Sequence, residues 1–307
     1  MRLELPVSDF SLRETLECGQ AFRWTAKNGA YYGFINNAAV RATQADSRLI
    51  LETVDSRLSA EAVRHYFALD VELARILASI DVDGQIHAAI QQHRGLRILR
   101  QDPWECLASF ICSSYNNIKR IQGMIERLSQ AYGSPAAFNG FRGSSFPSPV
   151  AVARAPERHL RQLGLGFRAP YLKATARLIA DGKLPLEMLK RTDYLRTKSA
   201  LLCCDGVGDK VADCVALFGL EKYEAFPVDL WIQRAMRYYF RRQQPTLKRV
   251  HDFAHRHFGR YAGYAQQYLY HYVRTARLVA KWPSGNVAQP TIHDHVLGHS
   301  ATGSPGH

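Results

Sequence analysis

The sequence has few cysteines and no long hydrophobic run. No run of about 18 apolar residues occurs, as a membrane-spanning helix would need, and the N-terminus lacks the apolar segment of a secretory signal. The six cysteines contain no C-x-x-C pair, and none follows Cys214. We therefore expect an intracellular protein without a disulfide framework, a structural zinc site or a four-cysteine iron–sulfur cluster near the C-terminus.

The charge balance is strongly basic. The 40 Lys and Arg residues against 27 Asp and Glu give a formal net charge of +13 at pH 7. Such a surplus is typical of a protein that binds a polyanion, most often nucleic acid, although membrane surfaces, heparin-like polymers or solubility alone would also explain it. Hydrophobic residues make up 47% of the 307, which is enough for a folded core and excludes a wholly disordered basic protein.

Short β-prone runs separated by turns occupy the region before residue 55. They cover Ala21 to Thr25, Tyr31 to Ile35, Ala39 to Thr43 and Leu49 to Val54. The dipeptide Asn28-Gly29 is a strong hairpin signal, because both residues tolerate the left-handed backbone of a tight turn. These runs predict an antiparallel meander of three or four strands.

Helical signals replace strand signals from about Ser59 onward. Ser59 and either Asp81 or Asp83 are candidate N-caps, since their side chains can accept hydrogen bonds from the first backbone amides of a helix. Apolar residues spaced by three and four predict two packed helices between residues 103 and 133, and the same period returns between residues 250 and 276.

The layout predicts an α+β fold with two domains and a tail. We expect an antiparallel sheet domain with flanking helices at residues 1–95 and a mostly helical domain at residues 96–282. Residues 283–307 are rich in Pro, Gly, Ser, Thr and His without any period, which is typical of a disordered tail.

A glycine-rich hairpin near residue 207 carries the first chemical signal. Gly206, Val207 and Gly208 precede an apolar-periodic run, so backbone amides at a helix N-terminus can approach a DNA phosphate closely. Lys210 lies in the first turn of that helix, where the positive end of the helix dipole favours the neutral amine that nucleophilic attack needs. A lysine that merely contacts a phosphate is the alternative.

A second signal follows in the segment Pro227-Val228-Asp229. Asp229 precedes another apolar-periodic run, which makes it a candidate N-cap. A carboxylate at a helix N-terminus is expected to stay ionised, and it could stabilise a cationic sugar or relay a proton. Either residue alone is unremarkable, and it is the combination of Lys210 with Asp229 that points to catalysis.

These residues resemble the helix–hairpin–helix and Gly/Pro-Asp signature of base-excision DNA glycosylases. The 8-oxoguanine DNA glycosylase branch is the closer match, with collinear resemblances from about residue 8 to residue 280. The blocks that carry it are Cys18 to Trp24, Tyr66 to Asp70, Gln101 to Ser114, Leu163 to Arg168 and Tyr261 to Gln266. The fold implied is an N-terminal antiparallel sheet domain followed by a helical helix–hairpin–helix glycosylase domain.

The resemblance implies a catalytic pair and a base pocket. Lys210 would be the nucleophile that expels the damaged base and leaves an imine able to undergo β-elimination, and Asp229 would stabilise the developing positive charge. Neither a metal nor an organic cofactor is implied. The residues implied for the base pocket are Gly19, whose carbonyl would accept the N7–H of 8-oxoguanine, Cys214, Gln266 and Tyr270, a position where family members often carry Phe.

A further set is implied on the side of the opposite strand. Arg120 and Arg168 match arginines that read the orphaned cytosine, and Phe167 matches a wedge that is commonly Tyr. Tyr115 departs from the family, which usually has Asn there to help fill the gap left by the flipped base. A tyrosine could fill the gap by stacking, so the preference for cytosine is left open.

The expected partner is double-stranded DNA containing 8-oxoguanine, bound by a monomer without membrane contact. The protein would act in the cytoplasm, on the nucleoid, in a prokaryote and in the nucleus in a eukaryote. Two other functions remain open: a sister glycosylase for an alkylated base or an oxidised pyrimidine, and a catalytically silent DNA-binding module. The set of Gly19, Gln266 and Tyr270 disfavours the first, and the pairing of Lys210 with Asp229 disfavours the second.

Two histidine patterns superficially suggest metal binding. His251 and His255 have the spacing of a zinc protease motif, but the middle residue is Asp252 rather than Glu and no third ligand is evident, so a solvated helix face is expected. Three histidines of the tail are expected to be part of a flexible polar segment: His293, His295 and His299.

Overall fold

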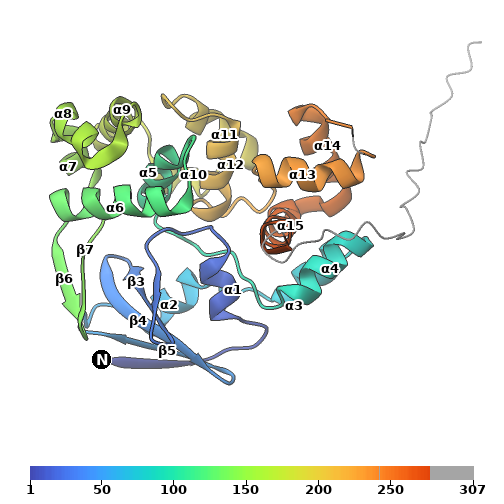
Figure 1. Cartoon of the computed structure of the whole chain (residues 1–307), viewed down its shortest axis with the longest axis horizontal. Helices are drawn as coiled ribbons and strands as arrows, with labels where there is room; N and C mark the ends of the chain where they lie inside the picture. Colours follow the sequence, from blue (N-terminus) through green and yellow to red (C-terminus); the bar gives the residue numbers. More distant parts are fainter. Residues whose placement is uncertain (242, 277–307) are drawn as a thin grey trace, which may run out of the picture.

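The computed structural model of the chain describes residues 1–241 and 243–276, and it is built from a sheet layer and a helical layer (Figure 1). The tail predicted at residues 283–307 lies outside the described residues. The predicted α+β class is confirmed, with the antiparallel sheet first and the helical part after it. No helix in the part of the chain that the structure describes is long and apolar enough to span a membrane.

The strands and helices have the following bounds along the chain. The strands are β1 (Arg2–Pro6), β2 (Thr25–Lys27), β3 (Ala30–Ile35), β4 (Ala38–Ala45), β5 (Arg48–Thr53), β6 (Pro135–Phe138) and β7 (Phe141–Ser144). The helices up to residue 132 are α1 (Leu12–Glu17), α2 (Ala60–Tyr66), α3 (Leu73–Ile80), α4 (Gly84–Gln92), α5 (Pro103–Ser113) and α6 (Ile118–Tyr132). The later helices are α7 (Pro149–Arg154), α8 (Glu157–Leu160), η1 (Arg161–Leu165), α9 (Arg168–Ala180), α10 (Leu186–Leu189), α11 (Tyr194–Leu202), α12 (Asp209–Phe218), α13 (Leu230–Tyr239), α14 (Leu247–Phe258), η2 (Gly259–Tyr261) and α15 (Ala262–Ala276).

The main sheet is a five-stranded antiparallel sheet in the order β1-β5-β4-β3-β2. Its turns use the residues expected of them: Asn28 and Gly29 both have positive φ, at 51° and 73°, as a two-residue hairpin between right-twisted strands requires. The predicted strand at residues 21–25 is wrong, because only Thr25 enters β2. The residues before it form an irregular turn that buries Phe22 and Trp24.

The edge strand β1 was not predicted. Only Leu5 is buried among its five residues, so the alternation that marks a half-buried strand is weak. It pairs with β5, the last strand of the meander, and therefore depends on a contact between segments far apart in the sequence.

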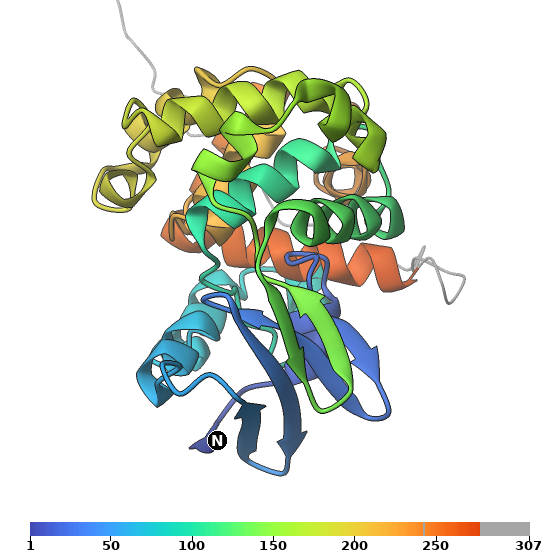
Figure 2. The same cartoon turned by 90° about the vertical axis from the view of Figure 1, so that its left-hand side faces the viewer.

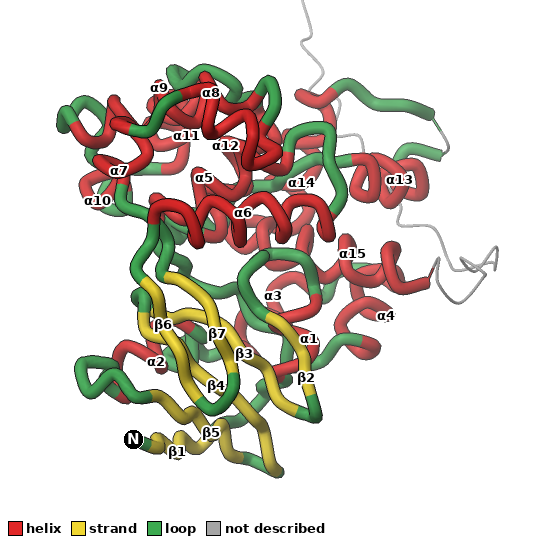
Figure 3. The backbone as a smooth tube through the Cα atoms, turned by 60° about the vertical axis from the view of Figure 1, so that its left-hand side comes forward, coloured by secondary structure: helices red, strands yellow, loops and turns green. Residues whose placement is uncertain are grey.

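A second hairpin also escaped prediction, since helical signals were expected throughout this region. Strands β6 and β7 form a two-stranded sheet that extends from α6 toward the main sheet (Figures 2 and 3). Phe141 of β7 packs against β3, with its ring centroid 5.6 Å from that of Tyr32 and 5.8 Å from that of Phe34. These aromatic contacts to the main sheet hold a hairpin that is too short to be stable alone.

The helices begin and end largely where their caps predict. The side chain of Ser59 accepts from the backbone of Ala62 at the start of α2, and Asp83 caps α4, whereas Asp81 ends α3. The two predicted pairs of helices are α5 with α6 and α14 with α15, as expected.

The two apolar clusters of the molecule do not divide at a single point of the chain. Leu5, Trp24 and Leu51 belong to the sheet cluster together with Leu99, whereas α3 and α4 contribute to the cluster of the helical part. A division into domains at residue 95 therefore stays a proposal, and the packing crosses that position in both directions.

Gln20 joins the sheet part to the segment before α5. Its side chain is completely buried, and its amide nitrogen donates to the carbonyl oxygens of Thr15 and Arg97, both at 2.8 Å. Its amide oxygen accepts from the backbone of Leu99 at 2.9 Å. Three backbone polar groups in the interior thus depend on one side chain.

We predict that Gln20→Leu lowers the free energy of unfolding by about 2–4 kcal/mol, because it leaves these buried backbone groups unpaired. Denaturation by urea measures the change. Gln91→Leu, at an exposed position of α4, is the control and should change stability by no more than about 0.5 kcal/mol. Equal effects of the two substitutions would contradict the prediction.

Candidate active site

A pocket of about 560 Å³ lies where α12, α13 and α15 meet the turn that follows α1. The six residues proposed for catalysis and base recognition all line it: Gly19, Lys210, Cys214, Asp229, Gln266 and Tyr270. A larger surface groove of about 710 Å³ lies along α3 and the end of α14 and contains none of them. Because residues separated by up to about 250 positions converge in the smaller pocket, we take it as the candidate active site.

The helix–hairpin–helix consists of α11, a short loop and α12. Gly206 has a φ of 77°, and a Cβ atom at this position would lie only 2.6 Å from the ring of Tyr171. Gly208 is the N-cap residue of α12, and the space around its Cα is open. The backbone amides that begin α12 are therefore accessible to an anion such as a phosphate.

Lys210 lies in the first turn of α12 and extends toward α5. Its Nζ atom is 3.3 Å from Ser113 Oγ and 5.0 Å from the centroid of the Phe110 ring. Both residues line the pocket. The amine thus contacts one hydroxyl group, one aromatic face and the Cys214 thiol, with no carboxylate bonded to it among the residues that the structure describes.

Asp229 is the N-cap of α13, as its sequence position predicted. Its Oδ1 atom accepts from the backbone amides of Trp231 and Ile232, both at 2.9 Å. Burial raises the pKa of this carboxyl group above its ordinary value, and the two amides and the charge of Lys210 only partly oppose that rise. Desolvation therefore outweighs the helix N-terminus in its effect on this pKa. That the carboxyl group stays ionised remains a prediction.

The turn at Cys18 and Gly19 forms one wall of the pocket. Gly19 has a φ of 85°, and a Cβ atom there would lie 3.2 Å from the Tyr270 hydroxyl and 3.2 Å from a nitrogen of Arg274. Both the backbone conformation and the contact distance thus favour glycine. Helix α15 holds the turn in place, because Gln267 donates to the Cys18 carbonyl at 3.0 Å and Arg274 donates to the Glu17 carbonyl.

Gln266 presents an unpaired acceptor. Its amide nitrogen donates to the Pro227 carbonyl at 3.1 Å, which fixes the orientation of the amide. Its Oε1 atom is buried and has no hydrogen-bond partner within residues 1–241 and 243–276. A buried acceptor of this kind is costly unless a ligand supplies a donor.

Cys214 and Tyr270 complete the apolar part of the pocket. Burial raises the pKa of the Cys214 thiol to about 12 and that of the Tyr270 hydroxyl to about 12. Both groups are therefore neutral at pH 7, and each offers a nonpolar surface that could contact a planar base. All six cysteines are free thiols.

The residues proposed for the opposite strand lie outside the pocket lining, in the loop after α5, on α6 and at the start of α9. Tyr115 follows α5 with a φ of 50°, and its side chain is 98% exposed. Phe167 is half exposed at the start of α9, and Arg120 is exposed on α6. An exposed aromatic side chain in a strained backbone conformation is unusual, and it suggests that the loop is built to contact a partner.

The Arg168 side chain is buried and does not face solvent. Its guanidinium carbon lies 4.3 Å from the centroid of the Phe167 ring, and the guanidinium donates to the backbone carbonyl oxygens of Ser114 and Tyr115. In this structure Arg168 therefore supports the Tyr115 loop.

A buried charge network behind the pocket was not predicted. Asp213 of α12 is completely buried, and its carboxylate lies 2.7 Å from the Tyr194 hydroxyl and 3.0 Å from Lys198 Nζ, both on α11. It also lies 3.2 Å from Nε2 of His251 on α14. The spacing of Lys198, Asp209 and Asp213 on two helices was the only signal of it in the sequence.

The predicted solvated face of α14 is only partly correct. His251 Nε2 contacts the Phe226 carbonyl at 3.1 Å as well as Asp213, and His255 Nε2 contacts the Glu224 carbonyl at 3.0 Å. The two histidines therefore bind the loop before α13. The tail histidines His293, His295 and His299 lie outside the described residues.

Family models cover most of the chain. The model described as 8-oxoguanine DNA glycosylase, N-terminal domain, matches residues 2–107, and the model of the HhH-GPD superfamily base excision DNA repair protein matches residues 108–258. Fold and site together define a base-excision DNA glycosylase with lyase activity. The chain belongs to the 8-oxoguanine DNA glycosylase family.

Individual relatives agree with this assignment. The chain is 34% identical to an N-glycosylase/DNA lyase of Saccharomyces cerevisiae, over 76% of this chain and 69% of the relative. It is 32% identical to an N-glycosylase/DNA lyase of Arabidopsis thaliana, over 87% of this chain and 78% of the relative. The structure of the 8-oxoguanine glycosylase/lyase of Clostridium acetobutylicum, bound to double-stranded DNA with cytosine opposite 8-oxoguanine, is 33% identical and superimposes with a TM-score of 0.84, covering 90% of this chain and 98% of that one.

We predict that Asp229→Asn raises the unfolding temperature at pH 7 while it lowers base excision by about 100-fold. Asparagine keeps the capping bonds and removes a buried charge. A carboxyl group whose pKa is higher in the folded than in the unfolded state lowers the free energy of unfolding when the pH is above the folded-state pKa. This loss of stability disappears as the pH falls below the pKa of the unfolded state, which is about 3.9. The gain in unfolding temperature should therefore shrink between pH 7 and about pH 4.

Thermal unfolding across this pH range measures the effect. Asp193→Asn is the matched control, because Asp193 caps α11 from an exposed position and its pKa is lowered by a backbone hydrogen bond from Arg196. At pH 7 the control should be neutral or destabilising. If Asp229→Asn and Asp193→Asn both lowered the unfolding temperature at pH 7, burial of the Asp229 charge would not destabilise the fold and the prediction would be refuted.

Proposed function

We propose that the protein removes 8-oxoguanine from double-stranded DNA and then cleaves the strand by β-elimination. The observation that carries the proposal is the convergence of Lys210 and Asp229, each near the N-terminus of a helix, with Gly19, Cys214, Gln266 and Tyr270 in one pocket. An amine nucleophile and a carboxylate beside a pocket lined by hydrogen-bonding and aromatic groups suit displacement of a planar base from a sugar.

The reaction begins at the sugar carbon that bears the base. The lone pair of Lys210 Nζ attacks C1′, the C1′–N9 bond breaks, and the base leaves with a proton. Asp229 stabilises the positive charge that develops on the sugar in this step, and its buried position strengthens the interaction. Loss of the proton from the lysine nitrogen and opening of the sugar ring leave an imine.

The second step breaks the strand. Removal of a proton from C2′ moves the electron pair of the C2′–H bond toward the imine, which becomes an enamine. The enamine then expels the phosphate oxygen from C3′, that oxygen leaves with the electron pair of the C3′–O bond, and a conjugated imine remains. Water then hydrolyses the imine and releases Lys210. The chemistry uses only the lysine, the carboxylate and water, so we propose no metal or organic cofactor for it.

Recognition of the base follows from the donors and acceptors of the pocket. 8-Oxoguanine carries a hydrogen on N7, where guanine has a lone pair. A backbone carbonyl at Gly19 would accept that hydrogen and repel the guanine lone pair. The unpaired Oε1 of Gln266 would accept from the Watson–Crick edge, and the base would lie between Cys214 and the ring of Tyr270.

The remaining residues would bind the duplex. We propose that the hairpin of Gly206, Val207 and Gly208 contacts a phosphate through its glycine amides, since the Val207 amide donates to the Cys204 carbonyl at 3.1 Å. Tyr115, Phe167 and Arg120 would face the gap and the orphaned base. Arg168 would support the Tyr115 loop. It would contact the orphaned base only after its guanidinium is released from the carbonyl oxygens of Ser114 and Tyr115. The net charge of +13 would strengthen binding at low salt.

The protein would act as a monomer on intracellular DNA, in the nucleoid of a prokaryote or the nucleus of a eukaryote, without contact to a membrane.

We predict that borohydride reduction traps a covalent adduct between the protein and an 8-oxoguanine duplex, because borohydride reduces the imine at Lys210. Lys210→Gln should abolish the adduct and lower base release at least 100-fold. Lys119→Gln is the control, since Lys119 also lines the pocket, and it should change trapping by less than about threefold. Base release without any adduct in the unmodified protein would show that water is the nucleophile, and Lys210 would then be a phosphate contact.

We predict that Tyr115→Ala lowers the single-turnover excision rate by about tenfold, because stacking of an aromatic ring on a base contributes about 1–3 kcal/mol. Tyr115→Phe keeps the ring and should stay within about twofold of the unmodified protein. Rates with each of the four bases opposite 8-oxoguanine would show whether stacking also relaxes the choice of cytosine. An alanine variant as fast as the unmodified protein would exclude Tyr115 from the gap.

A further inference from the structure

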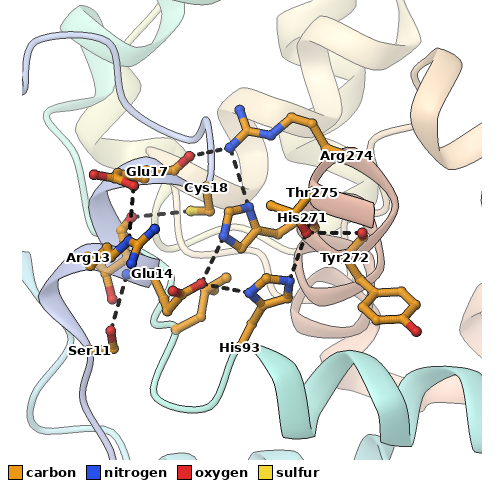
Figure 4. A network of polar contacts seen from close by, with 12 residues as sticks. Ser11, Arg13, Glu14, Glu17, Cys18, His93, His271, Tyr272, Arg274 and Thr275 are labelled. Carbon is orange, nitrogen blue, oxygen red and sulfur yellow. Dashed lines mark hydrogen bonds and ion pairs between the residues drawn. The ribbon is translucent and has the colours of Figure 1, made fainter. Parts of the chain in front are cut away.

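Three potential metal ligands meet behind the turn of Cys18 and Gly19. Glu14 lies on α1, His93 ends α4, and His271 lies on α15 (Figure 4). One carboxylate oxygen of Glu14 is 2.7 Å from His93 Nδ1 and 2.9 Å from His271 Nε2. Within residues 1–241 and 243–276, this is the only group of three such residues whose donor atoms all lie close together, within 4.8 Å of one another.

The surroundings fix the orientation of His93. The hydroxyl group of Thr275 donates to the backbone carbonyl of His271 at 2.8 Å, so its oxygen is free to accept from His93 Nε2 at 3.2 Å. Thr275 thus lies behind Nε2 of His93, and Nδ1 faces the Glu14 carboxylate. A ring nitrogen and a carboxylate oxygen 2.7 Å apart need a positive centre between them, because their lone pairs would otherwise repel each other.

That positive centre is either a proton or a metal ion. Thr275 contacts the ring nitrogen of His93 that points away from Glu14 and so fixes the orientation of the ring. Metal-bound histidines usually have a hydrogen-bonding group in this position. The two imidazole rings are only 4.1 Å apart at their centroids, so two positive rings would repel strongly. Both histidine side chains are 5% exposed, whereas Glu14 is 22% exposed and leaves a path for an ion or a water molecule.

We propose that Glu14, His93 and His271 bind a divalent transition-metal ion of the class of Zn²⁺, with a water molecule as the fourth ligand. Imidazole nitrogens and a carboxylate oxygen are ligands that Zn²⁺ accepts at about 2.0–2.2 Å. The three ligand atoms already lie within 4.8 Å of one another, so they would surround such an ion. The cysteine pattern could not indicate this site, because its ligands are one glutamate and two histidines, separated by 79 and 257 residues from Glu14.

The site would be structural, because none of its three ligands lines the candidate active site. It would link α1, α4 and α15 immediately behind Gly19. Coordination through Nε2 places the hydrogen of His271 on Nδ1, where Arg274 now lies at 3.3 Å. Arg274 would then turn away from His271, and since Arg274 lines the pocket, metal binding would also change that wall.

The full-length protein, stripped of metal with a chelator, tests the proposal. We expect titration calorimetry with Zn²⁺ to show one high-affinity equivalent, Co²⁺ to produce visible absorption bands of a site with nitrogen and oxygen ligands, and Zn²⁺ to raise the unfolding temperature. His93→Gln and His271→Gln should each lose that equivalent. A triple control with His293→Gln, His295→Gln and His299→Gln should keep it, because the tail histidines are another source of zinc binding.

A variant that keeps all three ligands tests the site without the risk that loss of a buried histidine unfolds the protein. Thr275→Val removes only the group behind His93 and should weaken Zn²⁺ binding by about 10–100-fold, while circular dichroism before metal addition shows whether each variant is folded. The proposal is overturned if the unmodified protein binds no Zn²⁺, or if the high-affinity equivalent survives in both folded histidine variants. The contact would then be a protonated ion pair between His93 and Glu14.

Discussion

The candidate active site depends on the position of one left-handed turn, that of Cys18 and Gly19. This turn leaves α1, at the edge of the sheet layer, but it is held from the other end of the chain by α15. Gln267 donates to the Cys18 carbonyl, and Gly19, with a φ of 85°, lines the pocket. A Cβ atom at Gly19 would lie 3.2 Å from the Tyr270 hydroxyl and from Arg274, so the helix that holds the turn also leaves little room for a side chain there.

Helix α12 meets two opposing demands. Its first turn must leave backbone amides and Lys210 accessible, whereas Asp213, further along the helix, is completely buried. A buried carboxylate is costly unless it is paired, and Tyr194, Lys198 and His251 supply the partners from two other helices. The network thus anchors α12 between α11 and α14, and only the N-terminal end of the helix is exposed.

Local signals predicted the elements well and the long-range pairings poorly. The hairpin at Asn28 and Gly29, the cap at Asp83 and the two pairs of helices depend on neighbouring residues, so they could be identified from the sequence. Strand β1 and the hairpin of β6 and β7 could not, because each is stabilised by contacts with β5 or β3 that are distant in the chain. The strand expected at residues 21–25 failed for the same reason, since packing of Phe22 and Trp24 overrides their β propensity.

The types of residue needed for the chemistry, and their order along the chain, are properties of the sequence alone. Lys210 near a helix N-terminus, Asp229 as a cap and the family resemblance needed no coordinates. Only the tertiary structure decided that burial raises the pKa of Asp229, that Arg168 supports the Tyr115 loop, and that Glu14 meets two distant histidines. Desolvation and the directions of hydrogen bonds depend on which distant segments pack together, and short-range sequence patterns carry no information about that.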